Sequence, residues 1–285
     1  MSGMRASAAW LAASAAAFLG AGALLSGQAP EPAPIPYVAT VKVNTSGSGS
    51  SFTRRLPGGT FLASNMLLRD LIAFAHGLQP FQIEAAPDWI GTVRFDVTLK
   101  AETNVAPVAI GPTQIGLQLA RAVLAERFAF QAHRETRERP VFALVRVRQD
   151  GPLGPRLRQS KTDCAALARQ AGESGAPWPP RSADGRILCG LQTQGATVTA
   201  GGYPMSEFQR VLTAQTQRVV IDRTGLAGAW DFELTFAPAD VAAAVSTDDP
   251  SLFTALQEQL GLRLDATRGP AEVLVVDRIE RPTPD

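Results

Sequence analysis

Histidine, cysteine and tyrosine are scarce in this chain, with two of each among 285 residues. A metal site needs several histidine, cysteine or carboxylate ligands at workable spacing, and neither an HExxH motif nor a cysteine cluster occurs. The sequence also lacks a phosphate-binding loop and a dinucleotide-binding fingerprint. We therefore expect no metal, no cofactor and no catalytic residue, and we interpret the protein as non-enzymatic.

An excess of charge of either sign is absent too. The 27 basic residues against 26 acidic residues leave a formal net charge of +1. A nucleic-acid-binding protein needs surplus lysine and arginine to displace counterions from phosphates, so nucleic acid is excluded as a partner. Hydrophobic residues make up 45% of the chain and charged residues 19%, which is enough for a folded core.

The N-terminal segment 1–29 differs in composition from the remainder. Arg5 is the only charged residue before Glu31, and 6–25 is an uncharged run rich in alanine. This pattern is typical of a secretory signal peptide, and the alternative is an uncleaved membrane anchor. Alanine and glycine insert weakly into a bilayer, which favours the signal peptide. In both cases we expect an extracytoplasmic protein, periplasmic or secreted, that touches a membrane only if 1–29 is retained.

Cys164 and Cys189 are the only cysteines. An exported chain lies where disulfides persist, so we expect these two residues to be bridged. In the chain-entropy treatment such a bridge stabilises the fold by about 3 kcal/mol. The alternative is two unrelated buried thiols.

Two stretches of the chain, 38–148 and 196–283, have similar patterns. In each, a short strand with a threonine near its start leads into an amphipathic helix, at 59–77 in the first half and at 196–212 in the second. The sequence therefore indicates an internal repeat.

The similarity continues beyond these helices. Residues 93–99 and 229–236 alternate apolar and polar side chains, as half-buried strands do. Each half then closes with an expected hairpin, through Pro140 in the first and Pro270 in the second. The order in each half is strand, helix, strand, strand, helix, strand, strand. It predicts an α+β fold with helices on one face of mostly antiparallel sheets.

Residues 149–195, between the two halves, show no such pattern. The stretch 151–155 reads Gly-Pro-Leu-Gly-Pro, and 176–180 reads Ala-Pro-Trp-Pro-Pro. Glycine and proline in these combinations mark loops. We expect an irregular linker that the disulfide holds in place rather than regular secondary structure.

Four residues are candidates for a functional role. His76 precedes Gly77 at a helix end, where an imidazolium would favourably face the helix dipole. His133 lies on a strand beside charged residues, and we interpret both histidines as structural or solvated. Asp222 and Arg223 lie between two strand-like runs and offer either an acid with an anion clamp or a turn. The first half has a simple link in the corresponding place, which favours the turn.

Several motifs together carry a resemblance to a known family. The chain resembles an uncharacterised family of exported soil-bacterial proteins, abundant in acidobacteria, over about 38–283. Its domain of unknown function also occurs fused to membrane zinc peptidases of the beta-lactam-sensor type. The matching stretches are 78–83, 87–89, 126–128, 133–136, 220–226 and 251–262.

The resemblance implies an extracytoplasmic protein without an established activity, so it carries no catalytic residue over to this chain. The usual pair of cysteines in the middle segment of the family matches Cys164 and Cys189. The zinc-peptidase portion is missing from this sequence, and its chemistry is not assigned here. Each half is also distantly similar, in pattern, to the short N-terminal domains of secretins and TonB-dependent receptors, which are interaction modules of the cell envelope.

We therefore expect an exported, non-enzymatic binding or protein-interaction module, with an unknown envelope or secreted protein as its partner. Sheet edges or a groove between the halves would supply the surface. One alternative is an enzyme with a site between the halves that draws on His76, His133 or Asp222. Another is an extracytoplasmic sensor input domain, in which the N-terminal run stays uncleaved.

Overall fold

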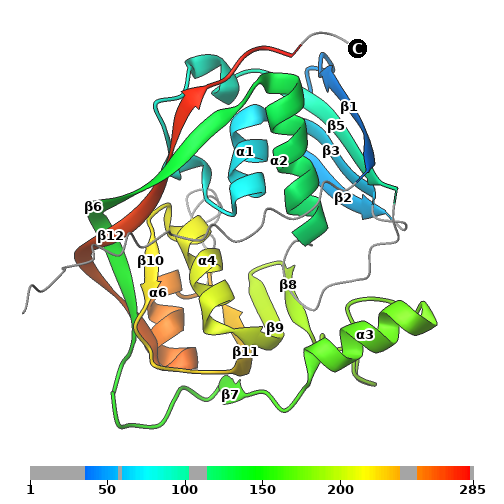
Figure 1. The fold of residues 1–285 in the computed structure, drawn as a ribbon. Helices are drawn as coiled ribbons and strands as arrows, with labels where there is room; N and C mark the ends of the chain where they lie inside the picture. The colour runs from blue at the N-terminus through cyan, green and yellow to red at the C-terminus, as the bar shows by residue number, and fades with distance from the viewer. Residues whose placement is uncertain (1–35, 57–59, 103–113, 238–248, 283–285) are drawn as a thin grey trace, which may run out of the picture. The chain divides into compact units, whose positions relative to one another are not determined.

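The computed structural model describes residues 36–56, 60–102, 114–237 and 249–282 (Figure 1). Residues 1–29, the expected signal peptide, lie outside these ranges. The described residues form three four-stranded, mostly antiparallel sheets with helices packed against them, which confirms the α+β class. None of the helices in these ranges is long and apolar enough to cross a membrane.

The first sheet belongs to the first half of the chain. Phe95, Val97 and Leu99 alternate with more exposed residues along one strand and are buried on one face, as their spacing predicts. They share a core with helices α1 (Leu68–His76) and α2 (Gln114–Phe128). The strands, in order across the sheet, are β1 (Tyr37–Val43), β5 (Arg94–Ala101), β3 (Thr60–Leu67) and β2 (Phe52–Leu56).

The equivalent sheet of the second half is built in the same way. Trp230, Phe232 and Leu234 are buried, and they share a core with α4 (Met205–Thr216). A short helix α6 (Leu252–Ala255) that continues as the π-helical turn η3 (Leu256–Leu260) joins the same core. The strands, in order, are β7 (Leu157–Gln159), β11 (Ala229–Thr235), β9 (Thr197–Pro204) and β8 (Gly190–Gln194).

The prediction that each half closes with a hairpin is wrong. Each expected hairpin is instead one long strand, β6 (Gln131–Arg146) and β12 (Leu262–Arg278), and the two pair antiparallel from end to end (Figure 1). Pro140 lies opposite Arg268 and Pro270 opposite Glu138, both within the ladder. No third strand is paired there in the described residues, so a proline without a backbone N–H is tolerated and the strand runs on.

The long strands link the two halves. In the central sheet, of order β10-β6-β12-β4, β4 (Ile83–Glu84) of the first half pairs parallel with β12, and β10 (Val220–Asp222) of the second half pairs parallel with β6. Leu274 of β12 belongs to the core of the first half, and Leu144 of β6 belongs to the core of the second. Each half is completed by a strand end from the other.

The middle segment is more regular than expected. Within 149–195 the structure places β7, α3 (Cys164–Ser174) and β8. The side chain of Asp163 caps α3 by accepting a hydrogen bond from the Ala166 backbone N–H at 2.9 Å, and Gly175 ends the helix in the left-handed region. The proline-rich stretches flank this helix, so they do not prevent it.

Both halves carry the same β-bulge, which supports the repeat. The register of β3 shifts near Asn65 and that of β9 near Gly202, and both residues have positive φ, 57° and 55°. In each case the backbone N–H of this residue donates to an aspartate on the neighbouring strand at 2.9 Å, Asp96 in the first half and Asp231 in the second. The same kind of β-bulge therefore bends β3 in the first sheet and β9 in the second.

Candidate functional site

A cavity of about 320 Å³ lies against the outer face of the second-half sheet. Two strands of the sheet, β9 and β11, form one wall, and the chain around β7 and the disulfide-linked segment form the others. The lining residues are Pro155, Arg156, Arg158, Thr162, Arg186, Ile187, Leu188, Thr199, Ala200, Asp231, Phe232 and Glu233.

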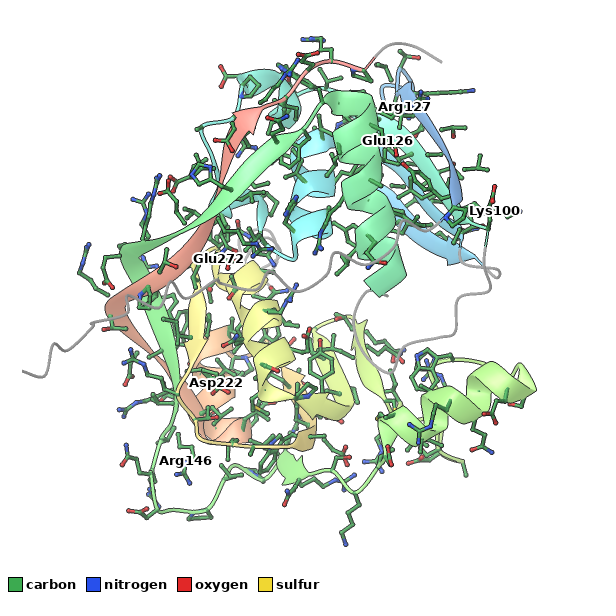
Figure 2. The ribbon with its side chains drawn as sticks, viewed as in Figure 1. Lys100, Glu126, Arg127, Arg146, Asp222 and Glu272 are labelled. Atoms are coloured by element: carbon green, nitrogen blue, oxygen red, sulfur yellow. A yellow bond between two sulfur atoms is a disulfide. The ribbon has the colours of Figure 1, made fainter. Side chains whose placement is uncertain are left out.

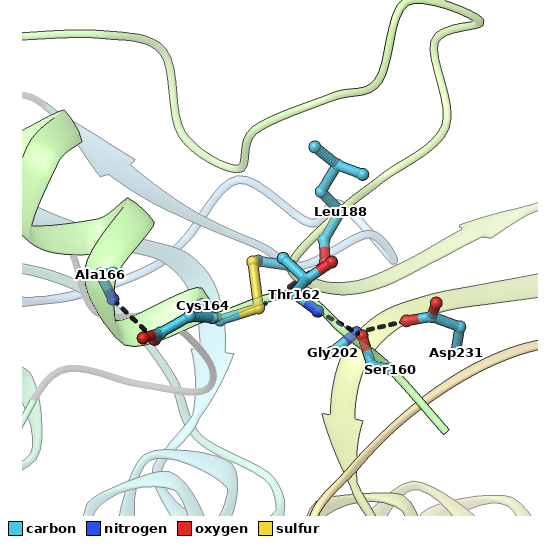
Figure 3. Close-up of a disulfide and its surroundings, with 9 residues drawn as sticks. Ser160, Thr162, Cys164, Ala166, Leu188, Gly202 and Asp231 are labelled. Atoms are coloured by element: carbon cyan, nitrogen blue, oxygen red, sulfur yellow. Dashed lines mark hydrogen bonds between the residues drawn. A yellow bond between two sulfur atoms is a disulfide. The ribbon is translucent and has the colours of Figure 1, made fainter. Parts of the chain in front are cut away.

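The disulfide holds one wall of this cavity in place. Cys164 and Cys189 are bridged, with Cα atoms 5.6 Å apart (Figure 3). The bridge lies directly over the sheet, because a Cβ added at Gly202 would come within 2.3 Å of the Cys164 Sγ. At Gly201 a Cβ would come within 2.6 Å of the Leu188 carbonyl oxygen. Two adjacent glycines therefore allow the cross-linked segment to rest on β9.

The cavity combines a small apolar part with a charged rim. Ile187 is buried and Leu188 partly buried, whereas the side chains of Ala200 and Phe232 belong to the core on the other face of the sheet, so these two residues line the cavity with their backbone. On the rim, the Arg158 Nε donates to the Asp231 carboxylate at 3.3 Å, and the Arg156 Nη1 donates to the Glu233 carboxylate at 3.1 Å. Each guanidinium keeps further N–H donors, since an arginine carries five. Such a surface can hold an apolar group and hydrogen-bond polar groups around it.

Asp222 and Arg223 form a turn rather than a cleft. Asp222 Oδ1 accepts hydrogen bonds from the Thr224 backbone N–H at 2.9 Å and from the Thr224 hydroxyl at 2.8 Å, which closes an Asx turn after β10 (Figure 2 labels Asp222). The Arg223 backbone N–H donates to the Leu144 carbonyl. Gly225 follows with φ of 69°, a conformation that glycine adopts without strain.

His133 lies on the exposed surface of β6. Its Nδ1 is 2.9 Å from the Asp277 carboxylate and its Nε2 is 3.0 Å from the Glu135 carboxylate. These two hydrogen bonds, first to Asp277 and then to Glu135, raise the pKa of His133. The histidine is therefore one member of a surface charge network.

His76 differs from the sequence-based interpretation. It lies at the end of α1 with its ring 5.6 Å from that of Phe130. Burial, and then the positive charges of Arg121 and Arg134, lower the pKa of His76 to about 4. The imidazole is therefore neutral at pH 7, and arginines rather than an imidazolium supply the positive charge at the end of this helix.

In the described part of the chain, no hydrogen bond or ion pair joins His76, His133 and Asp222 to one another, and none of them lines the cavity. The same part of the chain contains no group of three or more His, Cys, Asp or Glu side chains placed to hold a metal ion. The four candidate residues therefore do not form one site.

Sequence reasoning missed both the cavity and the arginines around α1. The cavity had a weak signal, since Asp231 and Glu233 alternate on the outer face of β11, opposite Arg158 of β7 and Arg156 just before it. The arginines had none, because Arg121 and Arg210 lie on helices of different halves and meet only in the folded protein.

The comparisons with known proteins place the chain in a family but do not give it a function. The family model described as a protein of unknown function, DUF3738, matches residues 69–279, and the chain belongs to this family. No curated protein and no solved structure gives a significant match. The match spans both halves and the middle segment, which agrees with cores that the two halves share.

Proposed function

We propose that the protein is an exported, non-enzymatic binding module that holds an extended segment of a partner protein in the cavity beside the disulfide. The observation that carries this proposal is a cavity in which the apolar residues Ile187 and Leu188 lie beside a rim of arginines. Protein interfaces have this make-up, with an apolar centre, a polar rim and arginine enriched among the contacts.

The lining residues favour binding over catalysis. Among the described residues that form the cavity there is no histidine, cysteine or serine. The carboxylate of Asp231 is already engaged, since it accepts from the Gly202 backbone N–H and pairs with Arg158. A general base needs a free lone pair within hydrogen-bond reach of a substrate proton. The two existing hydrogen bonds of Asp231 occupy much of its carboxylate, so this residue is a poor candidate for a general base.

Photo-crosslinking tests this proposal. A photoreactive residue in place of Arg186, at the cavity rim, is expected to give one reproducible adduct with a protein from the native extracytoplasmic fraction. Thr199→Arg fills the cavity from β9 and should abolish the adduct while the circular dichroism spectrum stays unchanged. The same photoreactive residue in place of Arg263, on exposed β12, is the control. An adduct that survives Thr199→Arg, or that also forms from position 263, would overturn the proposal.

Export is part of the same proposal. The apolar run at 6–25 and the Cys164–Cys189 disulfide support it, because disulfides persist outside the cytoplasm. The resemblance to exported soil-bacterial proteins and to domains fused to membrane zinc peptidases points the same way. Mass spectrometry of the mature protein tests it: a new N-terminus near residue 29 is expected, and a retained Met1 or Ser2 would instead indicate an anchored protein.

A further inference from the structure

Every carbonyl at the end of α1 has a hydrogen-bond donor. The backbone N–H groups of Gly77 and Leu78 donate to Phe74 and Ala73, as in the usual glycine-terminated helix. The next three carbonyl oxygens, those of Ala75, His76 and Gly77, each accept from the side chain of a different arginine.

These three arginines come from three elements. Arg121 of α2 donates from Nε to Ala75 at 2.8 Å, and Arg134 of β6 donates from Nη2 to His76 at 2.7 Å. Arg210 of α4, in the second half, donates from Nη2 to Gly77 at 2.9 Å. The three guanidinium groups therefore gather at one end of α1, close enough for Arg134 to feel the charges of Arg121 and Arg210. We call them the arginine cluster.

In the residues that the structure describes, the second half ends its matching helix without an arginine cluster. The matching helix of the second half, α4, ends with Gln217 in the left-handed region, φ 50°, and its side-chain amide donates to the Ala214 carbonyl at 2.6 Å. A neutral side chain therefore serves at the corresponding helix end. At α1, by contrast, three charged side chains serve three carbonyls, which gathers more positive charge at this helix end than at that of α4.

Positive charge exceeds negative charge at this place. Arg134 pairs with Glu272, which is labelled in Figure 2, and the Arg210 Nε lies 4.0 Å from Glu207. Arg121 adds a third positive charge at the same helix end, so three arginines lie beside two carboxylates. Burial, and then the charges of Arg121 and Arg210, lower the pKa of Arg134, as expected for cations crowded together. An anion would relieve this repulsion.

We propose that the arginine cluster binds a phosphate group. Guanidinium forks match the oxygens of phosphate, and each arginine here uses only part of its five N–H donors. The site is open to solvent, since the side chains of Arg134 and Arg210 are 43% and 45% exposed. Because Arg210 belongs to the second half, the bound phosphate links the two halves. The site does not depend on the cavity proposed above.

The scarcity of histidine makes the binding measurable. His76 and His133 are the only two histidines, so their ring protons are resolved by NMR. Burial, and then the charges of Arg121 and Arg134, lower the pKa of His76 to about 4, so a bound phosphate that offsets these charges is expected to raise that pKa. His133, held by Asp277 and Glu135, serves as the internal control and should not respond.

The titration is run with inorganic phosphate against sodium chloride of equal ionic strength, and separately with vesicles of phosphatidylglycerol against phosphatidylcholine. Arg210→Gln should weaken the response roughly tenfold, since it removes a charge-assisted hydrogen bond. Arg210→Lys should restore part of it. Arg263→Gln, which removes the same charge far along β12, is the control and should change nothing.

A response to inorganic phosphate that Arg210→Gln weakens supports a soluble phosphate ligand. A response only to phosphatidylglycerol vesicles, also weakened by Arg210→Gln, supports a lipid headgroup. The proposal is overturned if neither changes the His76 pKa beyond the chloride control, or if Arg210→Gln responds like the native protein.

Discussion

Gly202 is the residue on which the middle segment depends most directly. Its φ of 55° is one that only glycine adopts without strain, and a Cβ there would meet the Cys164 Sγ at 2.3 Å. At the equivalent bulge of the first half, Asn65 adopts a φ of 57°, which asparagine tolerates better than most residues, and its side-chain amide donates to the Ser48 and Ser50 carbonyls. The two halves therefore place different residues, asparagine and glycine, at the left-handed position of the same bulge.

Gly202→Ala is expected to lower the free energy of unfolding by roughly 2–3 kcal/mol, since it combines backbone strain with a clash in a packed region. Gly195→Ala is the matched control, because Gly195 has a φ of 59° with no atom within 4 Å. It should cost about 1 kcal/mol from strain alone. Urea denaturation measures both. In a C164A/C189A background the two costs should converge, and a persistent difference would mean that the disulfide is not the obstacle.

At the scale of elements, the bulge of the first half is held by a single carboxylate. Asp96 accepts hydrogen bonds from the Asn65 backbone N–H at 2.9 Å, from the Asn44 amide at 2.9 Å and from the Ser64 hydroxyl at 2.8 Å. Burial raises the pKa of Asp96, but these hydrogen bonds outweigh it and the net pKa is lowered. The ionised form therefore stabilises the fold above the ordinary pKa, and this contribution is lost as the pH falls through the lowered one.

Asp96→Ala is expected to cost about 2–3 kcal/mol at pH 7, because it strands three donors at the bulge. Asp231→Ala should cost less, about 1–2 kcal/mol, since Asp231 holds only one backbone N–H and an exposed arginine. Asp265→Ala, which breaks an exposed pair with Arg263, should stay within about 0.5 kcal/mol. Chemical denaturation ranks the three, and equal costs for Asp96→Ala and Asp265→Ala would contradict the role of the bulge.

The elements themselves were largely predictable, and their ends were not. Alternation in Phe95, Val97 and Leu99 identified a half-buried strand because one face of a sheet is buried with a period of two. The prolines at 140 and 270 suggested turns because proline usually interrupts a sheet. Here each proline lies where only two strands pair. Whether a third strand pairs beside a proline depends on the tertiary structure, so it is not predictable from the neighbouring residues in the sequence.

The candidate site was less predictable for the same reason. The turn at Asp222 was readable, since aspartate, threonine and glycine close turns through their own backbone. The contacts of Arg210 with Gly77 join residues 133 positions apart, and no local pattern encodes such a meeting.

At the scale of the whole molecule, the exchanged strand ends make the two halves one folding unit. Leu274 and Val276 of β12 are buried in the core of the first half, although they lie near the end of the sequence. The first repeat ends at residue 148 in the sequence, but the core of the first half also includes residues of β12 and so does not end there.

A fragment of residues 36–148 is expected to show no cooperative thermal transition, because it lacks the strand that closes its core. A chain that joins 36–148 through a flexible linker to 262–282 should recover one. Calorimetry compares the two with the protein of residues 36–282. A cooperative transition in 36–148 alone would show that the first half folds without β12.

The long antiparallel ribbon also sets the order of events during synthesis. A chain that emerges with its N-terminus first holds the first half without its final strand until nearly all of β12 has followed, because Gln131 pairs with Arg278. Contacts between such distant residues form slowly, since the intervening chain must first be ordered. The first half is therefore the first part of the chain to be made and the last to be closed, since its core waits for a strand from the opposite end of the described chain.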